Sequence, residues 1–214
     1  MSKLTKQEEI WVGQFGRAYT DRDSTNDQEL EAGYKSRWGS TRKEMNEQFL
    51  SEIDRSARIL EVGTNLGNQL LLLQSMGFEN LYGIEIQSYA VEMAKYRTKD
   101  INILWGSALD IPFKDGYFDL VFTSGVLIHI HTDDVTQAMK EIYRCSNRYV
   151  WGLEYYADQL TKFEDYRGQQ DLLWKENFSK RYLDLFPDLT LIKEEYSHYP
   201  DSENMDTMYL LSKA

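Results

Sequence analysis

Two segments of the chain combine glycines and carboxylates at a spacing that suits nucleoside binding. Glu61-Val62-Gly63-Thr64-Asn65-Leu66-Gly67 follows an apolar stretch, and Gly63 and Gly67 allow a tight turn that a ligand can approach closely. Glu85 comes 22 residues after Gly63, at the end of a second apolar stretch. A carboxylate in that place can accept hydrogen bonds from both hydroxyls of a ribose. The alternative is two loop glycines and a surface acid, but the order strand, turn, helix, strand and acid favours a nucleoside site.

The turn after Gly63 is a poor match for a dinucleotide. A GxGxxG fingerprint needs glycine at positions 63, 65 and 68, and both Asn65 and Asn68 depart from it. Asn tolerates left-handed backbone better than most residues, so the turn survives. Glu61, two residues before the first glycine, is unexpected beside a pyrophosphate. It suits a cofactor with a cationic amino-acid end, and S-adenosylmethionine has one.

Methyl transfer from a sulfonium needs an acceptor held in line with the S–CH₃ bond, which alone can supply about 7–11 kcal/mol. A hydroxyl acceptor also needs a base, and His is the usual choice. His129, five residues after Ser124, is the candidate base. Its structural alternative is to pack under the loop and hydrogen-bond a carbonyl. His131 is more readily explained by the start of a helix, and His198 by a solvated loop.

Glu154 and Tyr155 complete the candidate catalytic set. They end a later apolar stretch, where a carboxylate and a phenol could orient an amine or a sugar. An acid at a strand end beside core tyrosines is the structural alternative.

These residues must be positioned by alternating strands and helices. Strands are predicted at 59–62, 80–86, 101–105, 118–123 and 149–153, with helices at 67–76, 88–96 and 132–145. Two further strands, 189–193 and 207–212, have no long helix between them. We therefore predict an α/β, Rossmann-like, seven-stranded, mostly parallel sheet with one antiparallel edge strand and helices on both faces. Ligands of such sheets bind beyond the carboxyl ends of the strands.

Residues 1–54 differ in pattern from the rest, with Trp11, Phe15 and Tyr19 in one segment and a helical pattern at 42–53. We interpret them as an N-terminal helical cap of the same domain, whose Rossmann-like core is 55–214. An insertion at about 157–178 is long for a strand-to-helix connection. It is expected to form a lid or acceptor wall, or else an amphipathic helix packed on the core.

The overall composition limits the partners. The net charge is 24 − 35 = −11, which argues against a nucleic-acid partner unless a basic patch is hidden in the total. Cys145 is the only cysteine, so no internal disulfide can form, and a metal site is not expected. The first residues lack a signal-peptide pattern, and no apolar run is long enough to span a membrane. We expect a cytoplasmic protein that acts on a small polar metabolite.

The same segments resemble the motifs of class I S-adenosylmethionine-dependent methyltransferases. Residues 61–67 are similar to the first motif and residues 82–86 to the second, which implies that Glu85 holds the ribose and Ile86 lies beside it. Gly106-Ser107-Ala108 resembles the segment flanking adenine, although an Asp is common where Ser107 stands. Residues 118–122, followed by Ser124 to His129, resemble the fourth motif and its loop.

A narrower resemblance covers most of the chain. Residues 10–22 and 152–156 are similar to those of pseudaminic acid biosynthesis-associated methylases. The resemblance implies that Tyr19 and Asn26 close over the cofactor, and that the acceptor is an amino sugar or nucleotide-linked sugar. The alternatives are a methyltransferase for peptide or protein side chains, a non-catalytic cofactor-binding scaffold and, as an outsider, a dehydrogenase.

Overall fold

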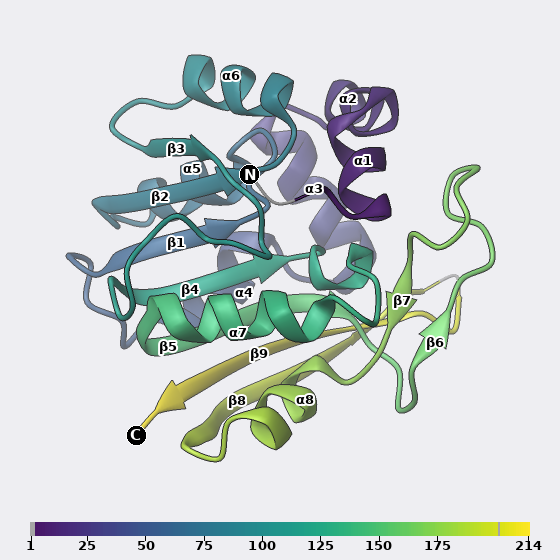
Figure 1. The fold of residues 1–214 in the computed structure, drawn as a ribbon. Helices are drawn as coiled ribbons and strands as arrows, with labels where there is room; N and C mark the ends of the chain where they lie inside the picture. Colours follow the sequence, from purple (N-terminus) through teal and green to yellow (C-terminus); the bar gives the residue numbers. More distant parts are fainter. Residues whose placement is uncertain (1–2, 201) are drawn as a thin grey trace.

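The computed structural model describes residues 3–200 and 202–214. It is built on one seven-stranded sheet, in the order β3-β2-β1-β4-β5-β9-β8 (Figure 1). Five strands are parallel: β1 (Arg58–Val62), β2 (Asn80–Glu85), β3 (Asn102–Trp105), β4 (Phe118–Ser124) and β5 (Ser146–Tyr155). The predicted Rossmann-like architecture is confirmed.

The far side of the sheet is the hairpin of β8 (Leu189–His198) and β9 (Met205–Lys213). β9 pairs antiparallel with β5, and β8 returns antiparallel along β9. β9 is therefore the antiparallel strand, and it lies between β5 and the edge strand β8.

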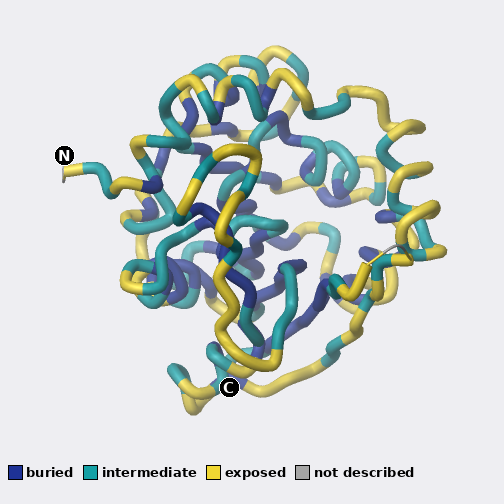
Figure 2. The backbone as a smooth tube through the Cα atoms, turned by 90° about the vertical axis from the view of Figure 1, so that its right-hand side faces the viewer, coloured by how far each residue is buried: buried dark blue, intermediate teal, exposed yellow. Residues whose placement is uncertain are grey.

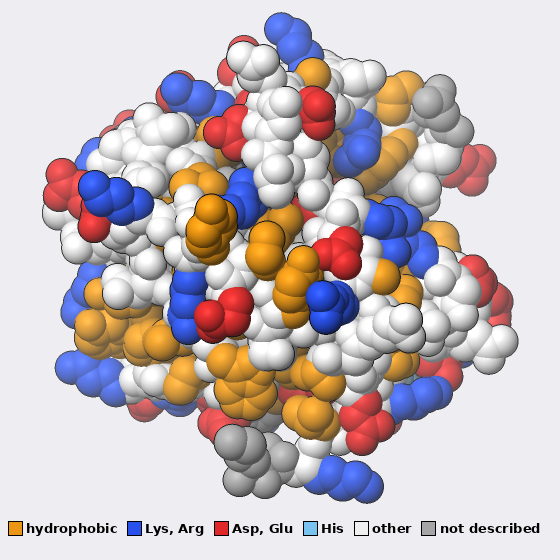
Figure 3. All heavy atoms as spheres, turned by 90° about the horizontal axis from the view of Figure 1, so that it is seen from above, with side chains coloured by type: hydrophobic (Ala, Val, Ile, Leu, Met, Phe, Trp, Pro, Cys, Tyr) orange, Lys and Arg blue, Asp and Glu red, His pale blue; other side chains and the backbone are white. Residues whose placement is uncertain are grey.

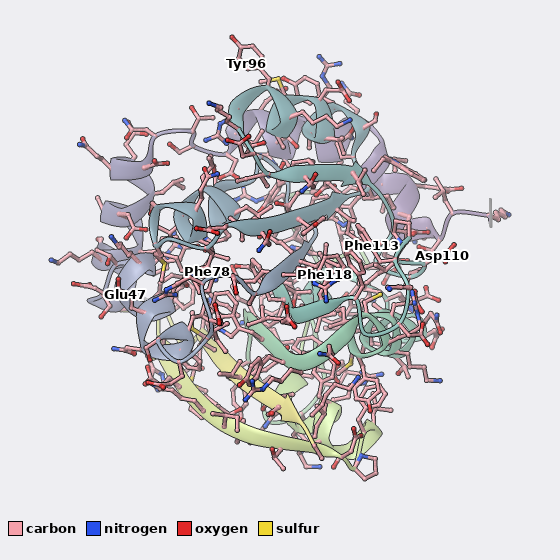
Figure 4. All side chains as sticks on the ribbon, turned by 90° about the vertical axis from the view of Figure 1, so that its left-hand side faces the viewer. Glu47, Phe78, Tyr96, Asp110, Phe113 and Phe118 are labelled. Atoms are coloured by element: carbon pink, nitrogen blue, oxygen red, sulfur yellow. The ribbon has the colours of Figure 1, made fainter. Side chains whose placement is uncertain are left out.

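Helices cover both faces of the sheet. On one face, α4 (Arg42–Leu50), α5 (Asn68–Ser75) and α6 (Ser88–Arg97) bury leucines and small residues against the strands. On the other, α7 (Val135–Cys145) and α8 (Phe178–Leu185) contribute to one apolar cluster with Phe118, whose ring centroid lies 4.7 Å from that of Phe113 (Figure 4). Tyr96 points outward from α6 and is 88% exposed (Figure 4). In Figure 2 the buried stretches run through the interior, between exposed outer segments.

Three helices precede α4: α1 (Lys6–Val12), α2 (Gln14–Arg22) and α3 (Asp27–Trp38). Residues 1 and 2 of the predicted cap lie outside the described residues. No residue of α3 is fully buried, and only Leu30, Tyr34 and Trp38 follow a helical spacing among charged neighbours, so its amphipathic pattern is weak. Its ends carry the local signals instead: the Asn26 side chain accepts from two backbone N–H groups, and Gly39 ends it at φ 78°.

The segment 157–178 does not form a helix of its own before α8 begins. It contains the two short paired strands β6 (Thr161–Lys162) and β7 (Trp174–Lys175), which lie to one side of the main sheet (Figure 1). Gln7 Nε2 of α1 donates to the Asp171 carbonyl at 3.0 Å, and Lys6 pairs with the Asp171 carboxylate at 3.3 Å. The N-terminal helices and this segment therefore meet.

Within residues 3–200 and 202–214, no helix is long and apolar enough to cross a membrane. On the face seen in Figure 3, acidic, basic and apolar side chains are interspersed.

Candidate functional site

The carboxyl ends of the central strands meet at one edge of the sheet. Val62 is in register with Ile84 of β2 and with Thr123 of β4, and Ser124 is in register with Leu153 of β5. The loops that follow these strands are therefore neighbours, although they come from four distant parts of the sequence.

The loop after β1 has three left-handed residues: Gly63 (φ 76°), Asn65 (φ 45°) and Gly67 (φ 76°). A Cβ added at Gly63 would lie 2.6 Å from Val126 Cγ2, so only glycine fits between β1 and the loop after β4. The left-handed backbone predicted for Asn65 is confirmed.

Asn65 also explains why this turn departs from glycine. Its Oδ1 accepts from Thr20 Oγ1 at 2.9 Å, and its Nδ2 donates to Asp23 Oδ2 at 3.2 Å. Asn68 Nδ2 donates to the same Asp23 oxygen at 3.3 Å. A glycine at position 65 would lose the bonds to Thr20 and Asp23, so Asn65 ties the loop to α2 while keeping its turn geometry.

Glu85 is the last residue of β2 and is buried beside this loop. Its carboxylate accepts from the backbone N–H of Asn65 at 2.9 Å and of Gln87 at 2.8 Å, one on each oxygen. A carboxylate has about four lone-pair positions, so about two stay available for a ligand. Burial raises the pKa of Glu85, while the backbone N–H groups of Gln87, Asn65 and Ile86 lower it.

Glu61 lies nearby on β1, with Oε2 accepting from Thr64 Oγ1 at 2.6 Å. Burial raises its pKa to about 8, against the opposing effects of the Thr64 bond and of Arg42. A cation brought next to this buried carboxyl group would stabilise its charged form.

A cavity of about 430 Å³ opens at these strand ends. The predicted residues that line it are Tyr19, Glu61, Gly63, Asn65, Glu85, Ile86, Ser107, Ala108, Ser124 and His129. Six carboxylates also belong to the lining: Glu8, Asp23, Asp27, Glu31, Glu61 and Glu85. Among the described residues that line it there is no Lys or Arg. The cavity is therefore lined by acidic side chains without a basic one, and burial keeps Glu61, with its pKa of about 8, protonated near pH 7 until a cation lies beside it.

Two predicted cofactor residues lie outside this lining. Asn26 is exposed, and its side chain accepts from the backbone N–H of Gln28 at 3.0 Å to cap α3. Gly67 precedes α5, where an added Cβ would approach Thr98 Cγ2 at 3.1 Å. Their contact with a cofactor stays a prediction.

His129 ends a single 3₁₀ turn, η1 (Leu127–His129), and is buried. Its Nδ1 lies 2.7 Å from the Leu172 carbonyl, so Nδ1 carries the proton and Nε2 keeps its lone pair. Its ring centroid is 5.0 Å from that of Trp11 and 4.8 Å from that of Tyr166. Burial lowers its pKa to about 4, so the imidazole is neutral near pH 7. His129 therefore combines the carbonyl hydrogen bond of the structural alternative with the cavity position that the catalytic interpretation requires.

Glu154 and Tyr155 line a different, smaller cavity of about 140 Å³. Glu154 accepts from the backbone N–H of Val126 at 3.2 Å and of Ile128 at 3.4 Å, which holds the start of η1. Burial raises the pKa of Glu154 to about 7. Its contacts suit a residue that positions the His129 turn, and its predicted catalytic role stays a prediction.

The other two histidines lie elsewhere. His131 Nδ1 is 3.4 Å from the Asp133 carboxylate and accepts from the Asp133 backbone N–H, at the approach to α7. His198 is exposed at the end of β8. In the described part of the chain, no group of three or more His, Cys, Asp or Glu side chains is arranged to hold a metal ion.

Sequence reasoning missed the contribution of Glu8. Its carboxylate accepts from Ser107 Oγ at 2.5 Å, and Ser107 Oγ accepts from the Leu109 backbone N–H at 3.0 Å. A carboxylate thus stands next to position 107, supplied by α1 instead of the loop after β3. The sequence marks Glu8 only as part of a capping box with Thr5, so its partner 99 residues away could not be predicted.

The lining also fits S-adenosylmethionine by its chemistry. Gly63 lines the cavity with no side chain, and Glu85 keeps lone pairs for hydroxyl donors. Trp11 Nε1 and Gln69 Oε1, on two lining residues, have no hydrogen-bond partner among the described residues. A polar ligand would satisfy such groups.

Comparison with known proteins agrees with this geometry. Residues 60–148 match the family model described as a methyltransferase domain. The match and the fold support a class I methyltransferase whose cofactor is S-adenosylmethionine. The chain is 28% identical to a protein of Encephalitozoon cuniculi that carries the name of a methyltransferase, over 75% of this chain and 76% of that one. It is 29% identical to an O-methyltransferase of Aspergillus nomiae, over 42% of each.

The solved structures extend the likeness to the fold as a whole. The magnesium protoporphyrin IX methyltransferase of Synechocystis, solved with bound S-adenosylmethionine, superposes with a TM-score of 0.67, covering 100% of both chains at 12% identity. The chain spans only 25% and 42% of the length of the first two curated relatives that it matches. The relatives therefore do not fix its acceptor.

Proposed function

We propose that this protein transfers a methyl group from S-adenosylmethionine to the nitrogen or oxygen of a small polar acceptor, such as an amino sugar or a nucleotide-linked sugar of a pseudaminic acid-type pathway. One observation carries the cofactor part of the proposal. The cavity at the strand ends has six carboxylates and, among its described lining residues, no Lys or Arg.

That charge distribution separates the candidate cofactors. A nicotinamide dinucleotide carries two phosphates. Such a cavity repels them, because the phosphates would lose their hydration without meeting a group of opposite charge. S-adenosylmethionine carries a sulfonium and an ammonium against a single carboxylate. The acidic lining therefore favours it and disfavours the dehydrogenase alternative.

The chain's own residues divide the work. Glu85 would bind the ribose, Glu61 the cationic end, and the Ser107–Glu8 pair would face the adenine. When bound, the cofactor supplies an electrophilic methyl group. For a hydroxyl acceptor, His129 Nε2 is the proposed proton acceptor, because its lone pair is left free by the Nδ1 bond to Leu172.

A small acceptor is supported by how the cavity is covered. Trp11 packs on Tyr19 at 5.2 Å between ring centroids, and Tyr166 of the segment 157–178 packs on His129. The N-terminal helices and this segment thus cover the site from two sides. This leaves less room for an acceptor side chain that is attached to a peptide or protein backbone. A curated relative from Plasmodium falciparum is named phosphoethanolamine N-methyltransferase, so small amines occur among acceptors of similar chains.

Calorimetry with S-adenosylmethionine, S-adenosylhomocysteine and NADH tests the cofactor. We expect micromolar binding of the first two and none of NADH. Transfer of a radiolabelled methyl group to a panel of amino sugars and nucleotide sugars then tests catalysis. Tight binding of NADH would support the dehydrogenase, and cofactor binding with no transfer to any acceptor class, peptides included, would support the scaffold.

A further inference from the structure

The smaller cavity adjoins the larger one at the end of β4. Tyr34, Ser124 and Gly125 line both cavities. The backbone N–H of Gly125 donates to the Leu153 carbonyl at 2.8 Å, which fixes this shared wall on the sheet. A group held in the smaller cavity therefore lies beside whatever fills the larger one.

Asp206 of β9 gives the smaller cavity an unusual polar group. The residue is 3% exposed and lines the cavity. Its Oδ2 accepts from Tyr199 Oη at 3.1 Å, but its Oδ1 has no hydrogen-bond partner among the described residues. A buried carboxylate oxygen without a donor is costly, and a ligand N–H or O–H would satisfy it.

Aromatic rings form much of the remaining wall, which Leu153 and the Glu154 carboxyl also line. Trp38 lies 4.9 Å from Tyr34 and 5.7 Å from Tyr199, and Tyr199 lies 6.1 Å from Tyr155, between ring centroids. Aromatic faces attract positive charge. Transfer of a methyl group to an amine leaves positive charge on nitrogen, whereas transfer to a hydroxyl that has lost its proton leaves a neutral ether. These rings therefore favour a nitrogen acceptor.

Several other charges surround Asp206. Arg37 of α3 is exposed and lies over the rings of Trp38 and Tyr199 at 5.1 and 5.6 Å. Lys175 of β7 and Arg42 of α4 are buried. All three cations act to lower the pKa of Asp206, although burial still raises it to about 7. No ion pair within 4.0 Å joins Asp206 to these groups in the described part of the chain. The cations oppose a bound ammonium and so favour an amine that has given up its proton.

We propose, on the basis of the function proposed above, that the Asp206 cavity is the acceptor pocket, and that it binds a small amine bearing an anionic group, with the nitrogen at Asp206 Oδ1 and the anion towards Arg37. An alkylammonium gives one proton to the Asp206 carboxylate, which becomes a carboxylic acid. The freed lone pair forms the new N–C bond as the C–S bond breaks, and the electrons of that bond stay on sulfur. The product is an N-methylammonium ion, and the proton on Asp206 returns to solvent.

Binding to the S-adenosylhomocysteine complex tests the pocket without relying on turnover. Two matched probe pairs are used: 2-aminoethyl phosphate with 2-hydroxyethyl phosphate, and glucosamine 6-phosphate with glucose 6-phosphate. We expect at least one amine to bind at least tenfold more tightly than its hydroxyl partner in titration calorimetry. Asp206→Asn should abolish that preference and leave the S-adenosylhomocysteine Kd within twofold. Asp184→Asn, which removes an exposed carboxylate from α8, is the matched control.

The remaining outcomes also decide the matter. Trp38→Leu should weaken amine binding at least fivefold while the hydroxyl probes are unaffected, which guards against an Asp206 variant that does not fold. Transfer to the amine that binds should fall by about 100-fold or more in kcat/KM in Asp206→Asn. Equal binding of amines and hydroxyls, no binding of any probe, or an Asp206 variant like the parent would overturn this pocket assignment. Failure of S-adenosylhomocysteine to bind would instead refute the proposed function, and this inference with it.

Discussion

Replacing Glu85 by Gln should weaken cofactor binding by a predictable amount. The carboxylate already accepts from the Asn65 and Gln87 backbone N–H groups, one on each oxygen, so about one lone pair per oxygen is left for a ribose hydroxyl. Each hydrogen bond to a charged group contributes about 1.5–3 kcal/mol. Gln keeps one acceptor oxygen and turns the other into an N–H donor. The loss should thus be about 2–3 kcal/mol, or roughly 30- to 150-fold in Kd.

Titration calorimetry with S-adenosylhomocysteine measures this change, and Glu79→Gln, at an exposed position just before β2, is the matched control. An analogue without the ribose 2′-hydroxyl separates the ribose contact from damage to the loop. The parent should lose affinity for it, and the variant should lose much less, because the partner is already missing. A folded Glu85→Gln protein with a Kd within twofold of the parent would refute the ribose role.

Three further predictions follow from the buried groups and the first two helices. The His129 pKa is lowered from 6.5 to about 4, so the unfolded chain binds more protons than the folded one between these pH values. The free energy of unfolding should therefore fall by about 3 kcal/mol as pH drops from 6.5 to 4. His129→Gln should flatten that part of a pH series of urea denaturation curves. The Glu61 pKa is raised from 4.5 to about 8, so stability present below pH 4.5 is lost as pH rises towards 8. Glu61→Gln should therefore raise the unfolding free energy of the ligand-free protein at pH 8 by up to about 5 kcal/mol, and its Tm with it, yet weaken S-adenosylmethionine binding. A lower Tm would contradict the assigned burial cost. Gly16→Ala would place a Cβ 1.8 Å from the Trp11 carbonyl oxygen, and should lower the Tm and weaken cofactor binding. The Cβ of Gly33→Ala in α3 meets nothing within 4 Å, so this variant should stabilise the protein by about 0.5–1 kcal/mol. Equal melting curves for the two variants would show that the α1–α2 corner tolerates the change.

Much of the core was predictable because its strands are apolar runs bounded by turn residues. The predicted strand 80–86 is observed at Asn80–Glu85, and the helix predicted at 88–96 is Ser88–Arg97. The helix α3 was not predicted, because no residue of it is fully buried and its short row of Leu30, Tyr34 and Trp38 stands among charged residues. The segment 157–178 could be recognised as an insertion by length, but not as the paired strands β6 and β7, since two-residue strands leave no alternation to detect.

The amino-acid sequence by itself determined the loop after β1, where we propose that the cofactor binds. Glycine at positions 63 and 67 and acids at 61 and 85 are chemical requirements of local backbone geometry and strand order, and these are encoded within about 25 consecutive residues. Only the tertiary structure decided which distant groups complete the site. Glu8 reaches Ser107, Asp23 holds Asn65, and Asp206 stands beside the end of β4, each across a separation that no local pattern records. The physical reason is that periodicity reports which face of an element is buried, whereas contacts between elements depend on how the whole chain packs.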